Sequence, residues 1–280
     1  MKHLFVILFI CSVIFTSCSK ELSYESNGTI TTPPKDSLLR REVYSDGTDS
    51  SVYTFGYDGS EKVIMQTFTD VSQNGTYNEQ IRLVRNSSEV ITQATIKNDS
   101  LAAHGIDSLV YFLNYDQSSS QYTYQLANFT INGFPARDSI AYTYDQSGNV
   151  AISEEFLYDG STYLPQSKYI FSYDGSGNVT DVQFLENDPN SGFYNAVTED
   201  QYQYDQKVSP LKMGFEAYIF NNFPMHSPNN VISDSYIDSS NPANNDVFTL
   251  SYTYNIHNEP SFGTLSNQSG GSENILFFYQ

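Results

Sequence analysis

The sequence predicts an all-β protein: a large antiparallel meander of many short-turned hairpins. Three observations favour this fold class: abundant Tyr and Phe, a recurring Tyr-Asp pair, and aromatic residues at every second position before the pairs. The chain holds 23 Tyr and 19 Phe but no Trp. Aromatic residues favour strands, and a Tyr ring packs while its hydroxyl stays hydrated, which suits a sheet near water.

Tyr-Asp pairs set a repeat along the chain. They begin at Tyr57, Tyr115, Tyr144, Tyr158, Tyr173 and Tyr204, with a Tyr-Asn variant at Tyr254. Their separations are 58, 29, 14, 15, 31 and 50 residues. Most lie near multiples of one strand of about ten residues plus a short turn, so we expect one strand in each unit. The last interval, which spans Pro210 to Pro242, breaks this rhythm.

Two copies of the repeat, Tyr142–Val150 and Phe171–Val179, carry complete turn chemistry. Asp at the first corner accepts hydrogen bonds from backbone amides two residues on, and Gly at the fourth adopts a positive φ and closes a type I hairpin with a bulge. The predicted turn residues are Asp145, Gly148, Asn149, Asp174, Gly177 and Asn178. At Asp58-Gly59 and Asp159-Gly160, the pair itself fits a two-residue turn.

Apolar and aromatic residues alternate with small or polar ones before the turns. Period-two spacing places each apolar trio on one face of its strand. The trios are Ile140, Tyr142 and Tyr144; Tyr169, Phe171 and Tyr173; and Leu250, Tyr252 and Tyr254. Stacked across neighbouring strands, they form ladders in which each pair contributes roughly 0.2 to 1 kcal/mol. We interpret the ladders as the core; an exposed platform for sugars or peptides is the alternative.

The first 21 residues follow the plan of a secretory signal. A basic start precedes an apolar segment, Leu4–Phe15, which is too short to span a bilayer as a helix. Two small residues then precede Cys18, as in a bacterial lipoprotein signal, so residues 1–17 are the predicted signal peptide and Cys18 the predicted lipidation site. An ordinary cleaved signal with an incidental cysteine is the alternative. Cys11 lies in the segment that would be removed.

A tether follows the lipidation site. Residues 18–41 are polar and turn-rich, which predicts a lipidated Cys and a flexible linker, and residues 42–280 form the predicted β domain. Lys20-Glu21 resembles the start of the signal that exports Bacteroidetes lipoproteins to the outer face of the outer membrane, although both residues also suit a soluble tether. We expect an outer-membrane, lipid-anchored protein that faces the periplasm or the cell surface.

The Tyr-x-Tyr-Asp-x-x-Gly-Asn-Val segments resemble tyrosine-aspartate (YD) repeats. Together with the lipoprotein signal and the chain length, they are similar to a Bacteroidetes family of uncharacterised lipoproteins described as having a porin-like fold. The resemblance covers most of Val43–Gln280, with two complete copies of the repeat. It implies a large antiparallel sheet that curls on itself, and it implies no activity, cofactor or catalytic residue.

An integral outer-membrane barrel is the structural alternative. The C-terminal run Asn274–Gln280 predicts a closing strand. A lipid-facing strand needs an apolar band over about nine to eleven residues. The candidate faces here are interrupted by polar residues such as Glu154, Asp181 and Gln183. We therefore expect a barrel that does not span the membrane.

Charge and motifs argue against several functions. A net charge of −19 repels nucleic acid. His104, His226 and His257 lack metal-site spacing, and no nucleophile elbow, phosphate loop or His-Glu-x-x-His motif occurs. Adjacent acids such as Glu154-Glu155 point to opposite faces of a strand and cannot flank one sugar bond. We expect no catalytic residue, no metal and no cofactor.

One modification pattern recurs. Four Asp-Ser pairs followed by Leu or Ile resemble the O-glycosylation signal of Bacteroidetes, with Ser37, Ser100, Ser108 and Ser139 as acceptors. Chance matches are the alternative, because Ser and Asp are abundant.

These features favour a non-enzymatic interaction module that is tied to the membrane through Cys18 and has a glycan or protein partner. The alternative is a carbohydrate-binding surface lipoprotein associated with a polysaccharide importer. Aromatic residues exposed in a cleft would favour that alternative, and acids converging in a pocket would favour an enzyme.

Overall fold

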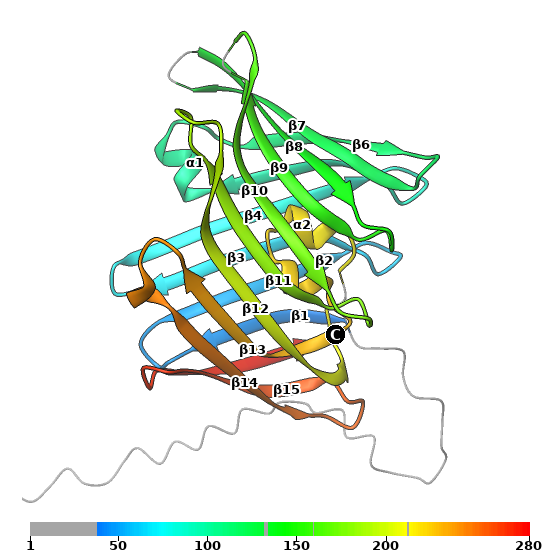
Figure 1. The fold of residues 1–280 in the computed structure, drawn as a ribbon. Helices are drawn as coiled ribbons and strands as arrows, with labels where there is room; N and C mark the ends of the chain where they lie inside the picture. The colour runs from blue at the N-terminus through cyan, green and yellow to red at the C-terminus, as the bar shows by residue number, and fades with distance from the viewer. Residues whose placement is uncertain (1–37, 132–133, 159, 212) are drawn as a thin grey trace, which may run out of the picture. The chain divides into compact units, whose positions relative to one another are not determined.

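The computed structural model describes residues 38–131, 134–158, 160–211 and 213–280, which belong to one compact unit. Within these residues the chain forms sixteen antiparallel strands that close into a barrel (Figure 1). The strands are β1 (Leu39–Ser45), β2 (Ser50–Tyr57), β3 (Val63–Ser72), β4 (Gly75–Arg85), β5 (Ile91–Asn98), β6 (Leu109–Asp116), β7 (Gln121–Ile131), β8 (Phe134–Tyr144), β9 (Val150–Tyr158), β10 (Tyr163–Tyr173), β11 (Val179–Asn187), β12 (Tyr194–Val208), β13 (Asn229–Asp238), β14 (Asp246–Tyr254), β15 (Pro260–Asn267) and β16 (Ser272–Tyr279). The short helical segments are α1 (Asp99–Ala103), α2 (Glu216–Ile219), η1 (Phe223–His226) and η2 (Pro242–Asn244).

Each strand pairs with its neighbours along the chain, and β1 pairs with β16 to close the sheet. In the closing pair, Glu42 lies opposite Phe277. Pairing in chain order needs only short connections between antiparallel strands. The predicted antiparallel meander is confirmed, and the structure adds that the sheet closes. The first strand begins at Leu39, three residues before the start that we expected for the β domain.

Aromatic side chains line the inner face of the barrel. On β1 to β4 the rings of Tyr44, Tyr53, Phe68 and Tyr77 follow one another with centroids 6.2, 4.7 and 6.3 Å apart. On β8 and β10 the predicted trios face inward, with Tyr142 and Phe171 buried in the core and their neighbours packed against it. For these two strands, the interpretation of the aromatic ladders as core is confirmed.

Outward positions alternate with the aromatic ones and are largely polar. Examples are Asn78, Gln80 and Arg82 on β4, and Glu199, Gln201 and Gln203 on β12. A membrane-spanning barrel shows the opposite arrangement, with an apolar band outside and a polar interior. On β4 and β12 the outward face is therefore suited to water, whereas β6, β15 and β16 also expose the apolar side chains of Phe112, Phe262 and Phe278. Within the described residues, no helix has the length and apolar character needed to cross a membrane.

Five turns of one form lie at the same end of the described barrel, which we call the Asp-turn rim. Each first residue accepts hydrogen bonds through its side-chain oxygen from backbone amides two and four residues on, at 2.8–3.1 Å. These first residues are Asp58, Asn86, Asp145, Asp174 and Asn255. The fourth residue of each turn has a φ between +62° and +86°, as Gly148 and Gly177 do. Glu61 fills this place after Asp58, so that turn is not the two-residue turn that Asp58-Gly59 suggested.

The repeat unit is a hairpin of two strands. Because antiparallel strands alternate in direction, only every second turn returns to the Asp-turn rim. The expected spacing of one strand and turn for each fourteen or fifteen residues is confirmed at Tyr144, Tyr158 and Tyr173, which end β8, β9 and β10, but the Asp turn itself recurs once for each hairpin. Tyr158 ends β9 at the opposite rim, so the pair that begins there is not a structural copy of the others.

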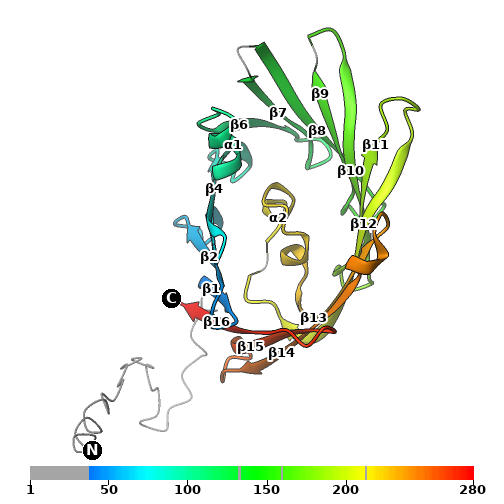
Figure 2. The same ribbon diagram turned by 90° about the vertical axis from the view of Figure 1, so that its left-hand side faces the viewer.

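The irregular interval between β12 and β13 runs through the inside of the barrel. We call residues 209–228 the plug; it carries α2 and η1, and α2 lies within the ring of strands (Figure 2). Its buried apolar side chains are Leu211, Met213, Ala217, Tyr218, Ile219, Phe220 and Phe223. A barrel of this many strands encloses more space than its wall can fill. The plug therefore supplies much of the core.

Candidate functional site

The plug packs against one side of the barrel wall. The ring of Phe215 stacks on Tyr122 of β7 with centroids 4.0 Å apart and meets Tyr142 of β8 edge-on at 4.8 Å. Phe223 lies 4.8 Å from Phe171 of β10. These aromatic contacts draw the plug toward β7, β8 and β10. The opposite part of the lumen, beside β1 to β3 and β12 to β16, is left less completely filled.

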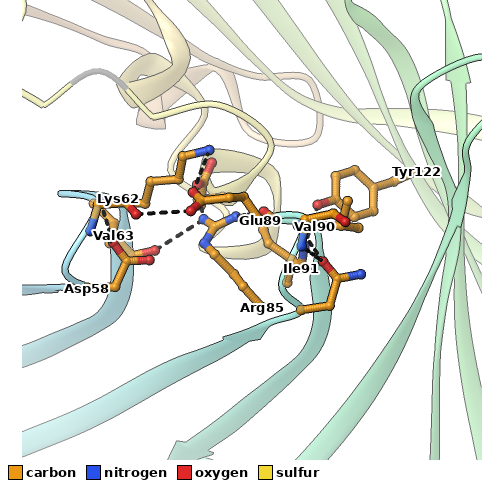
Figure 3. Close-up of polar contacts among 12 residues, drawn as sticks. Asp58, Lys62, Val63, Arg85, Glu89, Val90, Ile91 and Tyr122 are labelled. Carbon is orange, nitrogen blue, oxygen red and sulfur yellow. Dashed lines mark hydrogen bonds and ion pairs between the residues drawn. The ribbon is translucent and has the colours of Figure 1, made fainter.

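An ion pair ties the plug to the Asp-turn rim. Figure 3 shows Arg85 of this rim with its hydrogen-bond partners Val63 and Glu89. The Arg85 guanidinium pairs with Glu216 of α2, and both side chains are buried, with exposed fractions of 9% and 12%. Arg85 also donates to the backbone oxygens of Glu89 at 2.9 Å and Val63 at 3.3 Å. These contacts hold the guanidinium in place, so Arg85 links α2 to two neighbouring hairpins.

A second polar contact fixes the far side of the plug. The hydroxyls of Tyr218 in α2 and Tyr173 in β10 lie 2.6 Å apart. At the end of the plug, Ser227 accepts a hydrogen bond from the Val179 amide at 3.0 Å. The plug is thus held by packing and by polar contacts from three separate parts of the wall.

A chamber of about 460 Å³ lies between the plug and the less filled wall. Its rings come from Tyr44, Tyr53, Phe68, Tyr202, Phe248, Tyr252 and Phe277. It extends from Glu273, beside the turn between β15 and β16, to Ser209 and Asn229 at the two ends of the plug. A second cavity of about 480 Å³ shares Tyr53 and Asn222 with it. The chamber therefore runs most of the height of the barrel.

Three carboxylates line the chamber: Glu42, Asp234 and Glu273. Burial raises the pKa of Glu42 to about 7, and burial together with the charge of Asp200 raises the pKa of Asp234 to about 7. Burial also raises the pKa of Glu273, helped by nearby aspartates. No Lys, Arg or His is found among the described residues that line the chamber. The acids therefore face an aromatic space without a basic side chain to balance them.

The predicted turn residues lie at the Asp-turn rim and not in the chamber. Asp145 accepts hydrogen bonds from the amides of Ser147 and Asn149 at 2.8 and 2.9 Å. In the other complete copy, Asn178 donates to Asp174 at 2.8 Å and to Asn229, beside the plug, at 3.2 Å. These residues shape the rim and position the exit of the plug.

The predicted modification sites are scattered. Cys18, the signal peptide, most of the tether and Ser37 lie outside the described residues. Ser100 is exposed in α1, Ser108 precedes β6, and Ser139 lies within β8. No described element brings them together.

The adjacent acids of β9 point to opposite faces of the sheet. Glu155 accepts a hydrogen bond from Ser167 at 2.6 Å, whereas Glu154 accepts one from Tyr194 at 2.7 Å. In the described part of the chain, no group of three or more His, Cys, Asp or Glu side chains is placed to hold a metal ion.

Sequence reasoning missed the chamber acids and the plug. The broken rhythm between Pro210 and Pro242 was the available signal for the plug. Glu42 and Asp234 lie directly opposite inward aromatic residues of the neighbouring strands. This pairing cannot be predicted before the register of the strands is known.

Fold and chamber together define a class of protein: a closed antiparallel barrel with a polar exterior and a lumen partly filled by its own plug. A porin-like protein from Bacteroides uniformis has a similar structure, with a TM-score of 0.53, 10% identity, and coverage of 89% of this chain and 99% of that one. A porin-like protein from Bacteroides vulgatus also has a TM-score of 0.53, with 12% identity and coverage of 88% and 99%.

At these identities the likeness shows the fold alone. The porin-like fold implied by the sequence resemblance is confirmed. No protein-family model and no curated protein matches the sequence.

Replacing the plug anchor should destabilise the barrel. Arg85→Met leaves the Glu216 carboxylate buried without a counter-charge, and we expect the free energy of unfolding to fall by about 3–5 kcal/mol in urea titrations. Arg85→Met combined with Glu216→Leu should recover much of this loss, because the stranded charge is gone. Lys97→Met is the control, since Lys97 is 51% exposed in a surface pair with Asp107 and should change stability little. Equal effects of Arg85→Met and Lys97→Met would show that the pair does not anchor the plug.

Burial of Glu42 should make stability depend on pH. Since its pKa rises from 4.5 to about 7 on folding, the folded state binds more protons between these values, and stability is lost as pH rises through this window. A shift of this size corresponds to roughly 3 kcal/mol. We expect Glu42→Gln to be more stable than the parent by up to about this amount at pH 8 and similar to it at pH 4. Urea unfolding at both pH values tests this, and an equal difference at both would contradict it.

Proposed function

We propose that this chain is a lipid-anchored outer-membrane protein of the YD-repeat lipoprotein kind that acts without catalysis as a binding module, with the chamber as its binding site. The observation that carries the proposal is a water-facing barrel whose plug leaves an aromatic-lined space. Small-molecule sites typically occupy about 300–1,000 Å³, and the chamber, at about 460 Å³, falls in this range.

Support for the anchor comes from the sequence. Cys18 follows a signal-like segment, and the first strand begins only at Leu39, so a polar tether of about twenty residues separates the two. Such a tether lets the barrel stand clear of the bilayer. The barrel faces the periplasm or the cell surface.

Binding is favoured over catalysis by the kind of groups in the wall. The chamber presents rings, carboxylates and the amides of Asn222, Asn229 and Asn230. These groups hold and orient a ligand. Carbohydrate capture is the second candidate, because rings that line a recess can stack on sugars and carboxylates can accept hydrogen bonds from sugar hydroxyls.

A binding screen with a blocked chamber tests this proposal. We would measure saturation-transfer NMR with a panel of mono- and disaccharides, amino acids, choline and its neutral isostere 3,3-dimethylbutan-1-ol. Val231→Phe places a ring in the chamber, whereas Val52→Phe makes the same change at a position that alternates with the chamber residues Ser51 and Tyr53. We expect at least one compound to bind the parent and Val52→Phe but not Val231→Phe. No binding by any compound, or equal binding to both variants, would overturn the chamber as the site.

The anchor needs its own test. In a Bacteroides host fed with labelled palmitate, the parent chain should incorporate label and fractionate with the outer membrane. Cys18→Ala should lose the label and leave the protein in the soluble fraction. Label on Cys18→Ala, or membrane retention without label, would contradict lipid anchoring.

A further inference from the structure

The ligand class of the chamber can be argued from its strand register, on the basis that the chamber is the binding site of the proposed function. Glu42 on β1 lies opposite Tyr53 on β2 and opposite Phe277 on β16. All three side chains line the chamber. The Glu42 carboxylate is thus flanked on both sides by an aromatic ring, because directly paired residues share one face of the sheet.

Asp234 repeats this arrangement on another part of the wall. On β13 it lies opposite Tyr202 of β12 and Phe248 of β14, and all three again line the chamber. Two carboxylates, each between two rings, therefore project into the same space.

Both carboxylates lack partners in the described structure. Glu42 is only 8% exposed, and no described residue forms a hydrogen bond or ion pair with it. The Oδ1 atom of Asp234 is buried without a hydrogen-bond partner. A buried polar group normally has a partner, because leaving it unpaired costs about 1–3 kcal/mol or more for a charged group. Unpaired carboxylates that face a cavity are suited to pair with a group of a bound ligand.

Charge selects the kind of partner. The described lining residues include three acids and no base. A cationic ligand would compensate the negative charge of these acids, whereas a neutral sugar would leave that charge uncompensated. Aromatic faces also attract cations, more strongly when the site is dry. The cavity at the Asp-turn rim differs, because Lys62 and Arg85 line it together with Glu89 and Glu216.

We propose that the chamber binds an organic cation, with its alkylammonium group held between the aromatic rings that flank Glu42 or between those that flank Asp234. Either carboxylate would then compensate the charge of the cation.

Isothermal titration of the full-length protein with choline, at pH 8, tests the proposal. We expect saturable choline binding, and at least tenfold weaker binding of 3,3-dimethylbutan-1-ol, which has the same shape without the charge. At least one of the variants Glu42→Gln and Asp234→Asn should weaken choline binding at least tenfold while keeping the fold, as judged by circular dichroism. Glu154→Gln is the matched control, because Glu154 bonds Tyr194 on the outer side of the sheet. Its choline affinity should equal that of the parent.

One further variant addresses a lysine of the plug. Lys212 falls outside the described residues but lies between Leu211 and Met213 in the sequence. Unchanged choline affinity in Lys212→Gln agrees with compensation of the acids by the ligand. A higher affinity, which would show that Lys212 already balances an acid, or a lower affinity would contradict it.

The experiments distinguish a wrong ligand class from a wrong binding site. Absence of choline binding, equal binding of the neutral isostere, or unchanged affinity in both Glu42→Gln and Asp234→Asn would overturn the organic cation. If a sugar or another panel compound still bound the parent and not Val231→Phe, the chamber would stand as the binding site and only the ligand class would fall.

Discussion

The interior of this barrel is too wide for its own wall to fill, and most features of the structure follow from that constraint. Barrels of about eight strands are filled by their inward side chains, whereas larger ones leave open space. Here the chain fills the space with its own residues 209–228. Because the plug packs its rings against Tyr122, Tyr142 and Phe171, it fills one part of the lumen and leaves a chamber beside the other.

The buried acids of the chamber lower the stability of the folded protein. Burial raises the pKa of Glu42 to about 7, which means that its charged form is disfavoured in the folded protein. Glutamine would occupy the same volume without that penalty. Destabilising groups that gather in a cavity commonly mark a site of function rather than of structure. This reasoning connects the energetics of the fold to the proposal that a ligand supplies the missing charge.

The wall itself reverses the polarity of a membrane-spanning barrel. Many Tyr and Phe side chains pack inward, and Asn, Gln, Glu and Arg occupy outward positions of β4 and β12. The likeness to porin-like proteins therefore concerns the path of the chain. Membrane association in our proposal comes from Cys18, so the barrel is free to present its lumen to the surrounding water.

The sequence by itself determined the all-β class, the antiparallel meander and the form of the turns at Asp145 and Asp174, because period-two patterns and turn residues act over a few neighbouring positions. It did not reveal that the repeat is a hairpin, since a Tyr-Asp pair such as Tyr158-Asp159 looks the same at either rim. Only the tertiary structure decided that the sheet closes, that residues 209–228 turn inward, and that Glu42 meets Tyr53 and Phe277. The chamber depends on contacts between residues as far apart in the chain as Glu42 and Phe277. Local patterns carry no information about which distant strands become neighbours.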